Sequence, residues 1–251
     1  LADKDLYLDL HKEAIKKVNV NVDNFEKKAG FSVENKWFSR LSLKTQTCIK
    51  QSELNFNHGR LLYTLVSKYI NDKKLDKKNN IDFTLLETGT ARGFSSLCMS
   101  KALIDNNVNG RIITIDCIGH NEKMFWNCIS DSEGKKTREE LLSDWKLELA
   151  NIIFIQGWTL ETLKKLGLGR INFAFLDAQH SKNSVLEEFR YIYPMSKKYR
   201  KFLKKSTVKW STNYPKHKDL IWHIKKPGEK DYKETKSIPF DLSKEMVYNK
   251  K

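Results

Sequence analysis

Residues 85–96 read LLETGTARGFSS, and this stretch decides the fold. An apolar run leads to Glu87, two glycines follow four positions apart at Gly89 and Gly93, and a helix-like run begins near Ser95. Glycines let a backbone come close to a ligand, and the start of a helix offers unpaired N–H donors. The stretch therefore predicts a strand–turn–helix unit that binds a ligand. The alternative is a plain strand–helix turn whose glycines serve only packing.

The ligand of this turn is constrained by what the motif lacks. The spacing is not the GxGxxG of dinucleotide-binding turns, and no GKS or GKT follows, as it would in a P-loop. Glu87, two positions before the first glycine, suits a cationic group better than a pyrophosphate. A ligand that carries a methionine ammonium group and no phosphate fits this pattern.

Apolar runs and helix-like segments alternate around the turn. Strands are predicted at 82–87, 111–116, 151–157 and 171–177, and helices at about 95–105, 137–149, 159–167 and 182–194. Four short apolar runs separated by helices indicate a parallel sheet with right-handed crossovers. The predicted fold class is therefore α/β, with a Rossmann-like, mostly parallel sheet.

The segments on either side of this sheet differ in character. Helical periodicity is present at 5–18 and from Asn57 onward, whereas 19–52 look irregular. After Pro194 the alternation fails, and the one weak strand candidate is 219–224. The predicted organisation has three parts, namely an N-terminal helical extension or lid at 1–80, a Rossmann-like ligand-binding domain at 81–196 and a basic C-terminal segment at 197–251.

The formal net charge of +15 is concentrated in that C-terminal segment. Residues 197–251 hold 17 Lys and Arg against 6 Asp and Glu, a balance of +11, so the rest of the chain is nearly neutral. Such a tail is usually a solvated surface, and its excess of Lys over Arg weakens the case for specific phosphate recognition. Hydrophobic residues make up 39% of the chain, which is enough for a core.

Three further residues stand where predicted strands end. Asp116 ends the second strand, where a carboxylate can accept hydrogen bonds from both hydroxyls of a ribose. A lone Asp at the end of a strand is more often a helix cap. Asp177 and His180 follow the fourth strand. The ordinary pKa of histidine suits His180 to proton abstraction from a hydroxyl, and Asp177 would hold a divalent cation or orient the substrate. Alternatively, Asp177 and Ser181 merely cap the next helix.

Together these residues resemble the class I S-adenosylmethionine-dependent methyltransferases, with the closest likeness to the macrocin O-methyltransferase and methyltransferase 24 type. The fourth strand of that type ends in an Asp-x-x-His-Ser signature, which is present here as residues 177–181. The likeness covers about 115 residues well. It implies S-adenosylmethionine as cofactor, with Asp116 on the ribose and the methionine moiety among Glu87, Gly89, Thr90, Ala91 and Gly93.

The resemblance also implies that Gly157 and Trp158 lie beside the adenine, although many relatives have an acidic residue in place of Trp158. The N-terminal segment of such enzymes folds over the cofactor. His58 and Arg60 would then either reach the site or form an ordinary helix-capping surface pair.

The chain also departs from this family pattern. These enzymes normally have a fifth strand that ends in Asp-Asp or Asp-Asn and supplies further metal ligands, and no such pair follows Pro194. Either the chain is independent of metal or its C-terminal part is altered. A magnesium ion held by Asp177 is therefore a weaker expectation than the cofactor itself.

The predicted function is methyl transfer from S-adenosylmethionine to an oxygen of a small polar acceptor, such as a sugar or a secondary metabolite. Two alternatives are an RNA ribose methyltransferase anchored by the basic tail, and a catalytically inactive module that keeps the cofactor pocket. An NAD-dependent oxidoreductase is disfavoured because GxxxG replaces GxGxxG.

The location of the protein is predicted from the membrane and export signals that the sequence lacks. No run approaches the roughly 18 apolar residues of a membrane helix, and the charged residues 1–17 lack an apolar signal stretch, so a cytoplasmic protein without a membrane partner is expected. A homodimer is left open. The four cysteines show no CxxC pair or zinc-ligand spacing, which predicts ordinary reduced thiols.

Overall fold

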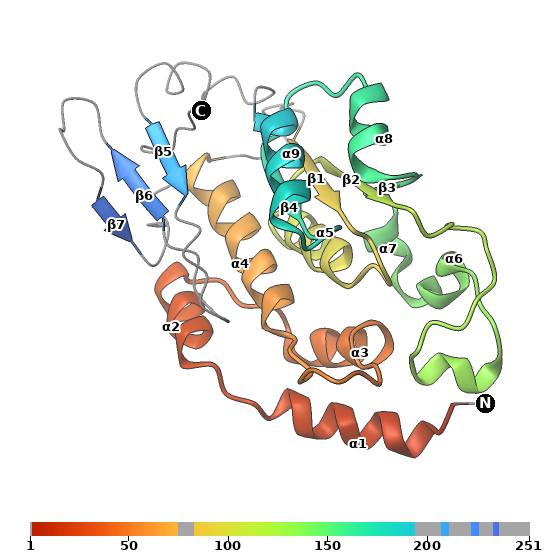
Figure 1. Ribbon diagram of the computed structural model, residues 1–251. Helices are drawn as coiled ribbons and strands as arrows, with labels where there is room; N and C mark the ends of the chain where they lie inside the picture. Colours follow the sequence, from red (N-terminus) through yellow and green to blue (C-terminus); the bar gives the residue numbers. More distant parts are fainter. Residues whose placement is uncertain (1, 75–82, 194–206, 211–221, 226–232, 236–251) are drawn as a thin grey trace. The chain divides into compact units, whose positions relative to one another are not determined.

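The computed structural model describes residues 2–74, 83–193, 207–210, 222–225 and 233–235 (Figure 1). Two compact units divide the chain, Leu1–Phe189 and Arg190–Lys251. The boundaries predicted from the sequence, 80/81 and 196/197, lie outside the described residues. The first unit contains the sheet, the N-terminal helices and every residue of the candidate site.

Four parallel strands form the sheet of the first unit: β1 (Phe83–Thr88), β2 (Gly110–Asp116), β3 (Ile152–Gln156) and β4 (Phe173–Leu176). Their order is β3-β2-β1-β4, and Leu85 lies opposite Ile112 on one side and Phe173 on the other. The predicted Rossmann-like α/β fold is confirmed. Because the chain leaves β1 toward β2 and later returns to pair β4 with the other side of β1, ligands are expected above the carboxyl ends of these strands.

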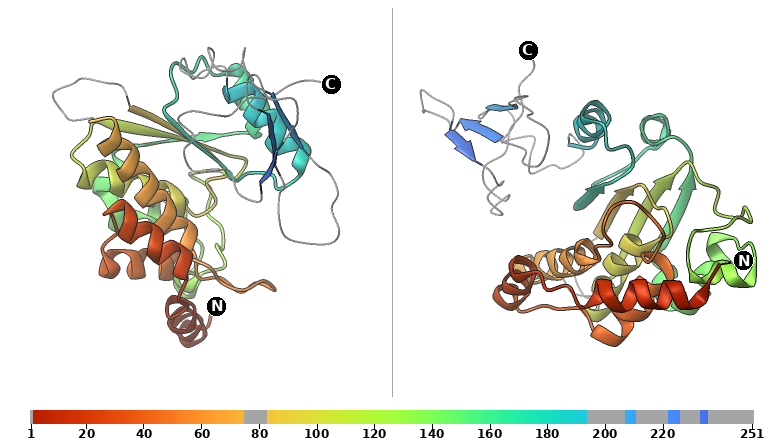
Figure 2. Two further views of the ribbon diagram at one scale, coloured as in Figure 1. Left: turned by 90° about the vertical axis from the view of Figure 1, so that its left-hand side faces the viewer. Right: turned by 60° about the horizontal axis from the view of Figure 1, so that its bottom comes forward.

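Helices cover both faces of this sheet. On one face lie α5 (Phe94–Asp105), α7 (Lys146–Leu149) and α4 (Asn57–Asp72), and on the other lie α8 (Thr159–Lys165) and α9 (Lys182–Ile192) (Figures 1 and 2). The core lies under α4 and α5, where Val66, Leu85 and Leu97 are completely buried. This packed layer fixes the position at which β1 turns into α5.

The single helix predicted at 137–149 is wrong. The segment contains α6 (Arg138–Leu141), a 3-10 turn (Ser143–Trp145) and α7, and it follows another 3-10 turn at Ile129–Glu133. Leu142 at the end of α6 has φ −97° and ψ 8°, which is outside helical geometry. The break lets Leu141, Leu142 and Trp145 all reach the core.

The expectation that residues 19–52 are irregular is also wrong. After α1 (Lys4–Ile15), this segment contains α2 (Val20–Ala29) and α3 (Asn35–Thr45). The Asn19 side chain accepts the Val22 N–H at 3.2 Å, and Gly30 ends α2 in the left-handed region at φ +77°. Residues that resemble helix breakers in the sequence are therefore the two caps of a helix.

The second unit contains a three-stranded antiparallel sheet in the order β5 (Thr207–Trp210), β6 (Trp222–Lys225) and β7 (Lys233–Thr235). The weak strand candidate at 219–224 overlaps β6. Within the described residues, no fifth strand extends the parallel sheet. The described helices include none with the length and apolar character needed to cross a bilayer.

Candidate functional site

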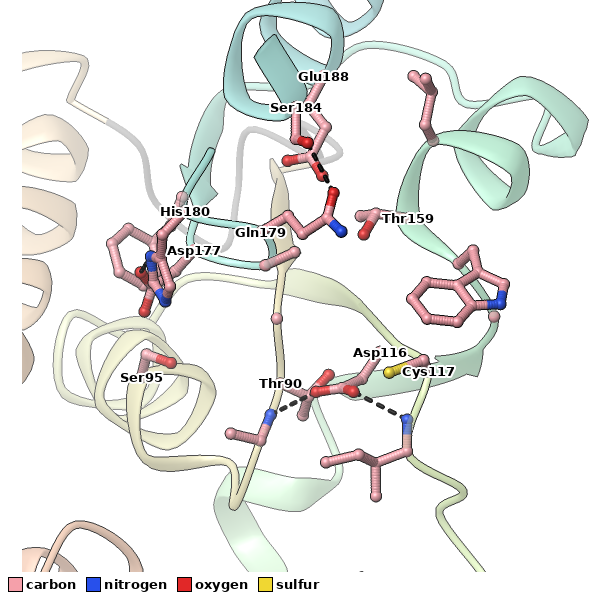
Figure 3. Close-up of a pocket in the computed structure, with 18 of the residues that line it drawn as sticks. Thr90, Ser95, Asp116, Cys117, Thr159, Asp177, Gln179, His180, Ser184 and Glu188 are labelled. Atoms are coloured by element: carbon pink, nitrogen blue, oxygen red, sulfur yellow. Dashed lines mark hydrogen bonds and ion pairs between the residues drawn. The ribbon is translucent and has the colours of Figure 1, made fainter. Parts of the chain in front are cut away.

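A cleft of about 1230 Å³ opens at the carboxyl ends of the four parallel strands (Figure 3). Eight of the ten predicted site residues line it: Gly89, Thr90, Ala91, Asp116, Gly157, Trp158, Asp177 and His180. Figure 3 shows Asp116 near Thr90 and Cys117, with Asp177 and His180 on one side and Thr159 on the other. Glu87 and Gly93 lie outside the set of described lining residues.

The glycine turn brings the loops after β1 and β4 into contact. Gly89 has φ +87°, and a Cβ atom there would lie 2.3 Å from the carbonyl oxygen of Asp177. No side chain fits at that distance, so glycine is required both for conformation and for space. The Asp177 N–H in turn donates to the Thr88 carbonyl at 2.8 Å. The predicted cofactor turn and the Asp-x-x-His signature therefore form one continuous wall.

Asp116 is held at the tip of β2 by backbone groups. Its two carboxylate oxygens accept the N–H of Ala91 at 2.6 Å and the N–H of Ile118 at 2.8 Å. Ala91 belongs to the turn after β1, so the carboxylate joins the turns that follow two neighbouring strands. Each oxygen keeps acceptor capacity toward the cleft, because a carboxylate offers about four acceptor positions.

Glu87, near the end of β1, is 0% exposed. Ser95, Ser96 and Thr114 donate their hydroxyl hydrogens to its carboxylate, the last at 2.6 Å. Burial raises the pKa of Glu87 to about 7, and the three hydroxyls act against this shift. The side chain of Glu87 is thus fully buried and contacts hydroxyl groups of α5 and β2, and its contact with a cofactor stays a prediction.

Asp177 and His180 lie on the same loop, with 3.7 Å between Asp177 Oδ1 and His180 Nδ1. The His180 side chain is 81% exposed, and burial raises the pKa of Asp177 above its ordinary value, which the His180 charge partly opposes. The first turn of α9 is capped by Ser181, whose Oγ accepts the Ser184 N–H at 3.2 Å. Asp177 is therefore not needed as the cap.

Gly157 and Trp158 follow β3 and also line the cleft. The Gly157 N–H donates to the Asp116 carbonyl at 2.8 Å, which ties this loop to the end of β2. Trp158 is 67% exposed, so its indole is accessible for a planar ligand to stack against.

His58 and Arg60, the two candidate residues of the N-terminal segment, take different positions in the structure. His58 lines the cleft, its ring centroid 4.9 Å from that of Phe94, and burial lowers its pKa to about 4. Arg60 instead forms ion pairs with Asp23, at 2.6 Å, and with Glu26, and so ties α4 to α2. His58 is therefore neutral at physiological pH, and Arg60 serves the helical layer.

Sequence reasoning missed several lining residues, of which Glu188 on α9 is the most informative. Its carboxylate is almost completely buried, accepts the Thr88 hydroxyl at 2.8 Å, and has its pKa raised by burial. The only available signal was its place among Val185, Leu186 and Phe189 on a helix whose apolar residues face the sheet. Such a position is ordinarily apolar.

The donor set for the predicted metal is incomplete in the described part of the chain. No group of three His, Cys, Asp or Glu side chains there is arranged to hold a metal ion. Asp177 and His180 supply only a pair. No catalytic step is therefore assigned to a metal, and ligation by Asp177 stays a prediction.

The sheet order, the glycine turn after β1 and the carboxylate at the tip of β2 define a Rossmann-like methyltransferase domain. Residues 86–199 match the model of a family described as a methyltransferase domain, the methyltransferase 24 family. The chain is accordingly an S-adenosylmethionine-dependent methyltransferase. A search of curated proteins gives no match.

Solved structures similar to this one include two methyltransferases. The O-methyltransferase NovP is 15% identical, with 77% of this chain and 80% of NovP covered at a TM-score of 0.41. The S-adenosylhomocysteine-bound methyltransferase PaMTH1 of Podospora anserina is 16% identical, with 71% of this chain and 66% of PaMTH1 covered at a TM-score of 0.41.

Gly89→Ala should damage the cleft more than an equally strained glycine substitution elsewhere. Gly30 is a matched control, since it also has positive φ, +77°, but has nothing within 4 Å of an added Cβ. Gly30→Ala should cost about 1–2 kcal/mol of left-handed strain. Gly89→Ala should cost more and weaken S-adenosylhomocysteine binding, as measured by denaturation and calorimetry. Equal losses in both variants would show that the Gly89–Asp177 contact is unimportant.

Glu87→Gln should change how stability depends on pH. The unfolded chain releases the Glu87 proton near the ordinary pKa of 4.5, whereas the folded chain keeps it to about pH 7. Between those values the folded state binds more protons, so this residue makes the free energy of unfolding fall as pH rises. Denaturation at pH 5, 6, 7 and 8 should give a smaller fall for Glu87→Gln than for wild type, while the exposed Glu13→Gln keeps the wild-type dependence. Parallel curves for all three proteins would contradict this assignment.

Proposed function

We propose that the chain transfers a methyl group from S-adenosylmethionine to a hydroxyl oxygen of a small polar acceptor. One observation carries the proposal, namely the contact between Gly89 and the backbone of Asp177. It makes the cofactor turn and the Asp177–His180 loop adjoining parts of one cleft. A methyl donor on the first would then face an acceptor bound against the second.

Each part of the cofactor has a matching group along the cleft. Asp116 would accept the ribose hydroxyls, Gly89 to Ala91 would surround the methionine part, and Gly157 and Trp158 would contact the adenine. Bound there, S-adenosylmethionine supplies a methyl group activated by its sulfonium. The cationic sulfonium and ammonium suit a cleft in which Asp116 and Asp177 are both present.

His180 is the proposed base for the acceptor hydroxyl. Its exposed ring on the loop after β4 can reach a bound acceptor, and Asp177 Oδ1, 3.7 Å from Nδ1, would stabilise the imidazolium after it takes the proton. Holding acceptor and donor in line would supply much of the rate increase. His58 is the other cleft histidine among the described residues, and its low pKa makes it a poor proton acceptor at neutral pH.

The charge of the lining favours an uncharged or cationic acceptor over an anionic one. Five carboxyl side chains line the cleft: Asp116, Glu161, Asp177, Glu187 and Glu188. The one arginine among the described lining residues, Arg92, donates from Nε to the Thr45 carbonyl at 2.5 Å and from Nη1 to the Trp126 carbonyl at 2.7 Å. A phosphate group would therefore meet repulsion, which weighs against the alternative of an RNA substrate.

His180→Ala should lower turnover by about 10²- to 10⁴-fold, the usual contribution of a general base, with S-adenosylhomocysteine affinity nearly unchanged. His180→Gln, which keeps a polar side chain but cannot take the proton, should be equally slow. Turnover is measured with methyl-labelled cofactor on the best acceptor from a panel of neutral hydroxylated compounds, and affinity by calorimetry.

Wild-type rates in both His180 variants would remove that residue from the role of base. A wild-type protein that methylates RNA but none of the neutral compounds would contradict the small-molecule assignment. Location in the cytoplasm and assembly as a homodimer stay predictions.

A further inference from the structure

Asp116 and Arg138 both bind the backbone of Ala91 and of Ile118, Asp116 through the N–H groups and Arg138 through the carbonyl groups. The Asp116 carboxylate accepts the N–H of Ala91 and the N–H of Ile118. The Arg138 guanidinium donates to the carbonyls of those same residues, from Nε to Ala91 O at 2.8 Å and from Nη2 to Ile118 O at 3.3 Å. Nη2 also lies 3.9 Å from Asp116 Oδ2. The four residues form a closed ring between the turns after β1 and β2.

Arg138 is buried, at 2% exposed, and is not one of the described residues that line the cleft. Its guanidinium carbon lies 5.5 Å from the ring centroid of Trp126 and 5.8 Å from that of Phe154. Its own N–H donates to the His120 carbonyl at 3.1 Å. A buried cation held on several sides in this way has little freedom to move.

The ring also supports an unusual backbone conformation. Ala91 has φ +44°, in the left-handed region that costs a non-glycine residue about 1–2 kcal/mol. Such a conformation persists only when neighbouring contacts enforce it. Here the Ala91 N–H is held by Asp116 and the Ala91 carbonyl by Arg138, so both sides of the strained residue are fixed.

We propose that Arg138 is a positioning residue for S-adenosylmethionine: through Ala91 and Ile118 it fixes the Asp116 carboxylate in the geometry that binds the ribose hydroxyls. This inference rests on the proposed cofactor site and assigns a role to a residue that does not touch the ligand. Lysine cannot replace it, because an ammonium lacks the planar fork that reaches two carbonyls at once.

The test is Arg138→Lys with two ligands, S-adenosylhomocysteine and its 2′-deoxy analogue, measured by calorimetry. Wild type should bind S-adenosylhomocysteine more tightly than it binds the 2′-deoxy analogue. The variant should bind S-adenosylhomocysteine about 10- to 100-fold more weakly, as expected for loss of charged hydrogen bonds, whereas the 2′-deoxy analogue, which keeps only the 3′-hydroxyl, should lose less affinity. General damage to the cleft would weaken both ligands alike, so an unchanged ratio of the two affinities overturns the proposal.

A double-mutant cycle tests whether Arg138 acts through Asp116. Asp116→Asn should weaken binding, and adding Arg138→Lys should weaken it little further, because both changes remove the same interaction. Additive losses would contradict the inference. Arg60→Lys is the control for altering a partly buried arginine, and it should lower stability while leaving S-adenosylhomocysteine affinity unchanged.

Two further outcomes are distinguished by measurements on the wild type. If wild type binds no S-adenosylhomocysteine, the proposed cofactor site fails before the role of Arg138 is reached. If Arg138→Lys does not fold, the Nε–H signal of Arg138 is followed by NMR in wild type. It should shift on addition of S-adenosylhomocysteine and less on addition of the 2′-deoxy analogue, and equal responses to the two ligands would overturn the proposal.

Discussion

The close approach of Gly89 to the backbone of Asp177 is the constraint on which the rest of the site depends. β1 and β4 are neighbours in the sheet, so the loops that follow them begin side by side. An atom as small as a Cβ would separate these loops, because it would lie 2.3 Å from a carbonyl oxygen. With glycine there, the turn proposed for the cofactor and the loop proposed for proton transfer share one wall. Methyl transfer needs this adjacency, since donor and acceptor must meet in line.

Charge is distributed around that wall in two layers. At the end of β1, Glu87 is buried and accepts hydrogen bonds from hydroxyl groups, and its raised pKa favours a shared or retained proton over a full charge. Behind the turn, Arg138 faces Asp116 and the carbonyls of the two loops. A buried cation without such partners would be strongly destabilising, so the arginine and the loop geometry stabilise each other. The chain as a whole is strongly basic, whereas the lining of the cleft is rich in carboxylates.

The sheet could be predicted from the sequence because buried parallel strands appear as continuous apolar runs, and each of the four runs became a strand. Other features depend on partners distant in sequence. The sequence does not predict α2, because Asn and Gly are typical both of breaks between helices and of helix caps, and Asn19 and Gly30 are the caps. His58 and Arg60 differ in role only because α4 points one toward the cleft and the other toward α2. No sequence motif marks Arg138, because its hydrogen-bond partners are carbonyl groups 47 and 20 positions away in the sequence.

One cleft at the carboxyl ends of β1 to β4 is proposed to hold S-adenosylmethionine with its ribose on Asp116. A crystal structure of the protein grown with saturating S-adenosylhomocysteine tests it most directly. Both ribose hydroxyls should lie within hydrogen-bond distance of the Asp116 carboxylate, with the adenine against Trp158 and the sulfur facing the Asp177–His180 loop. Ligand bound elsewhere, or a ribose held by other groups while Asp116 keeps only its two backbone partners, would contradict it.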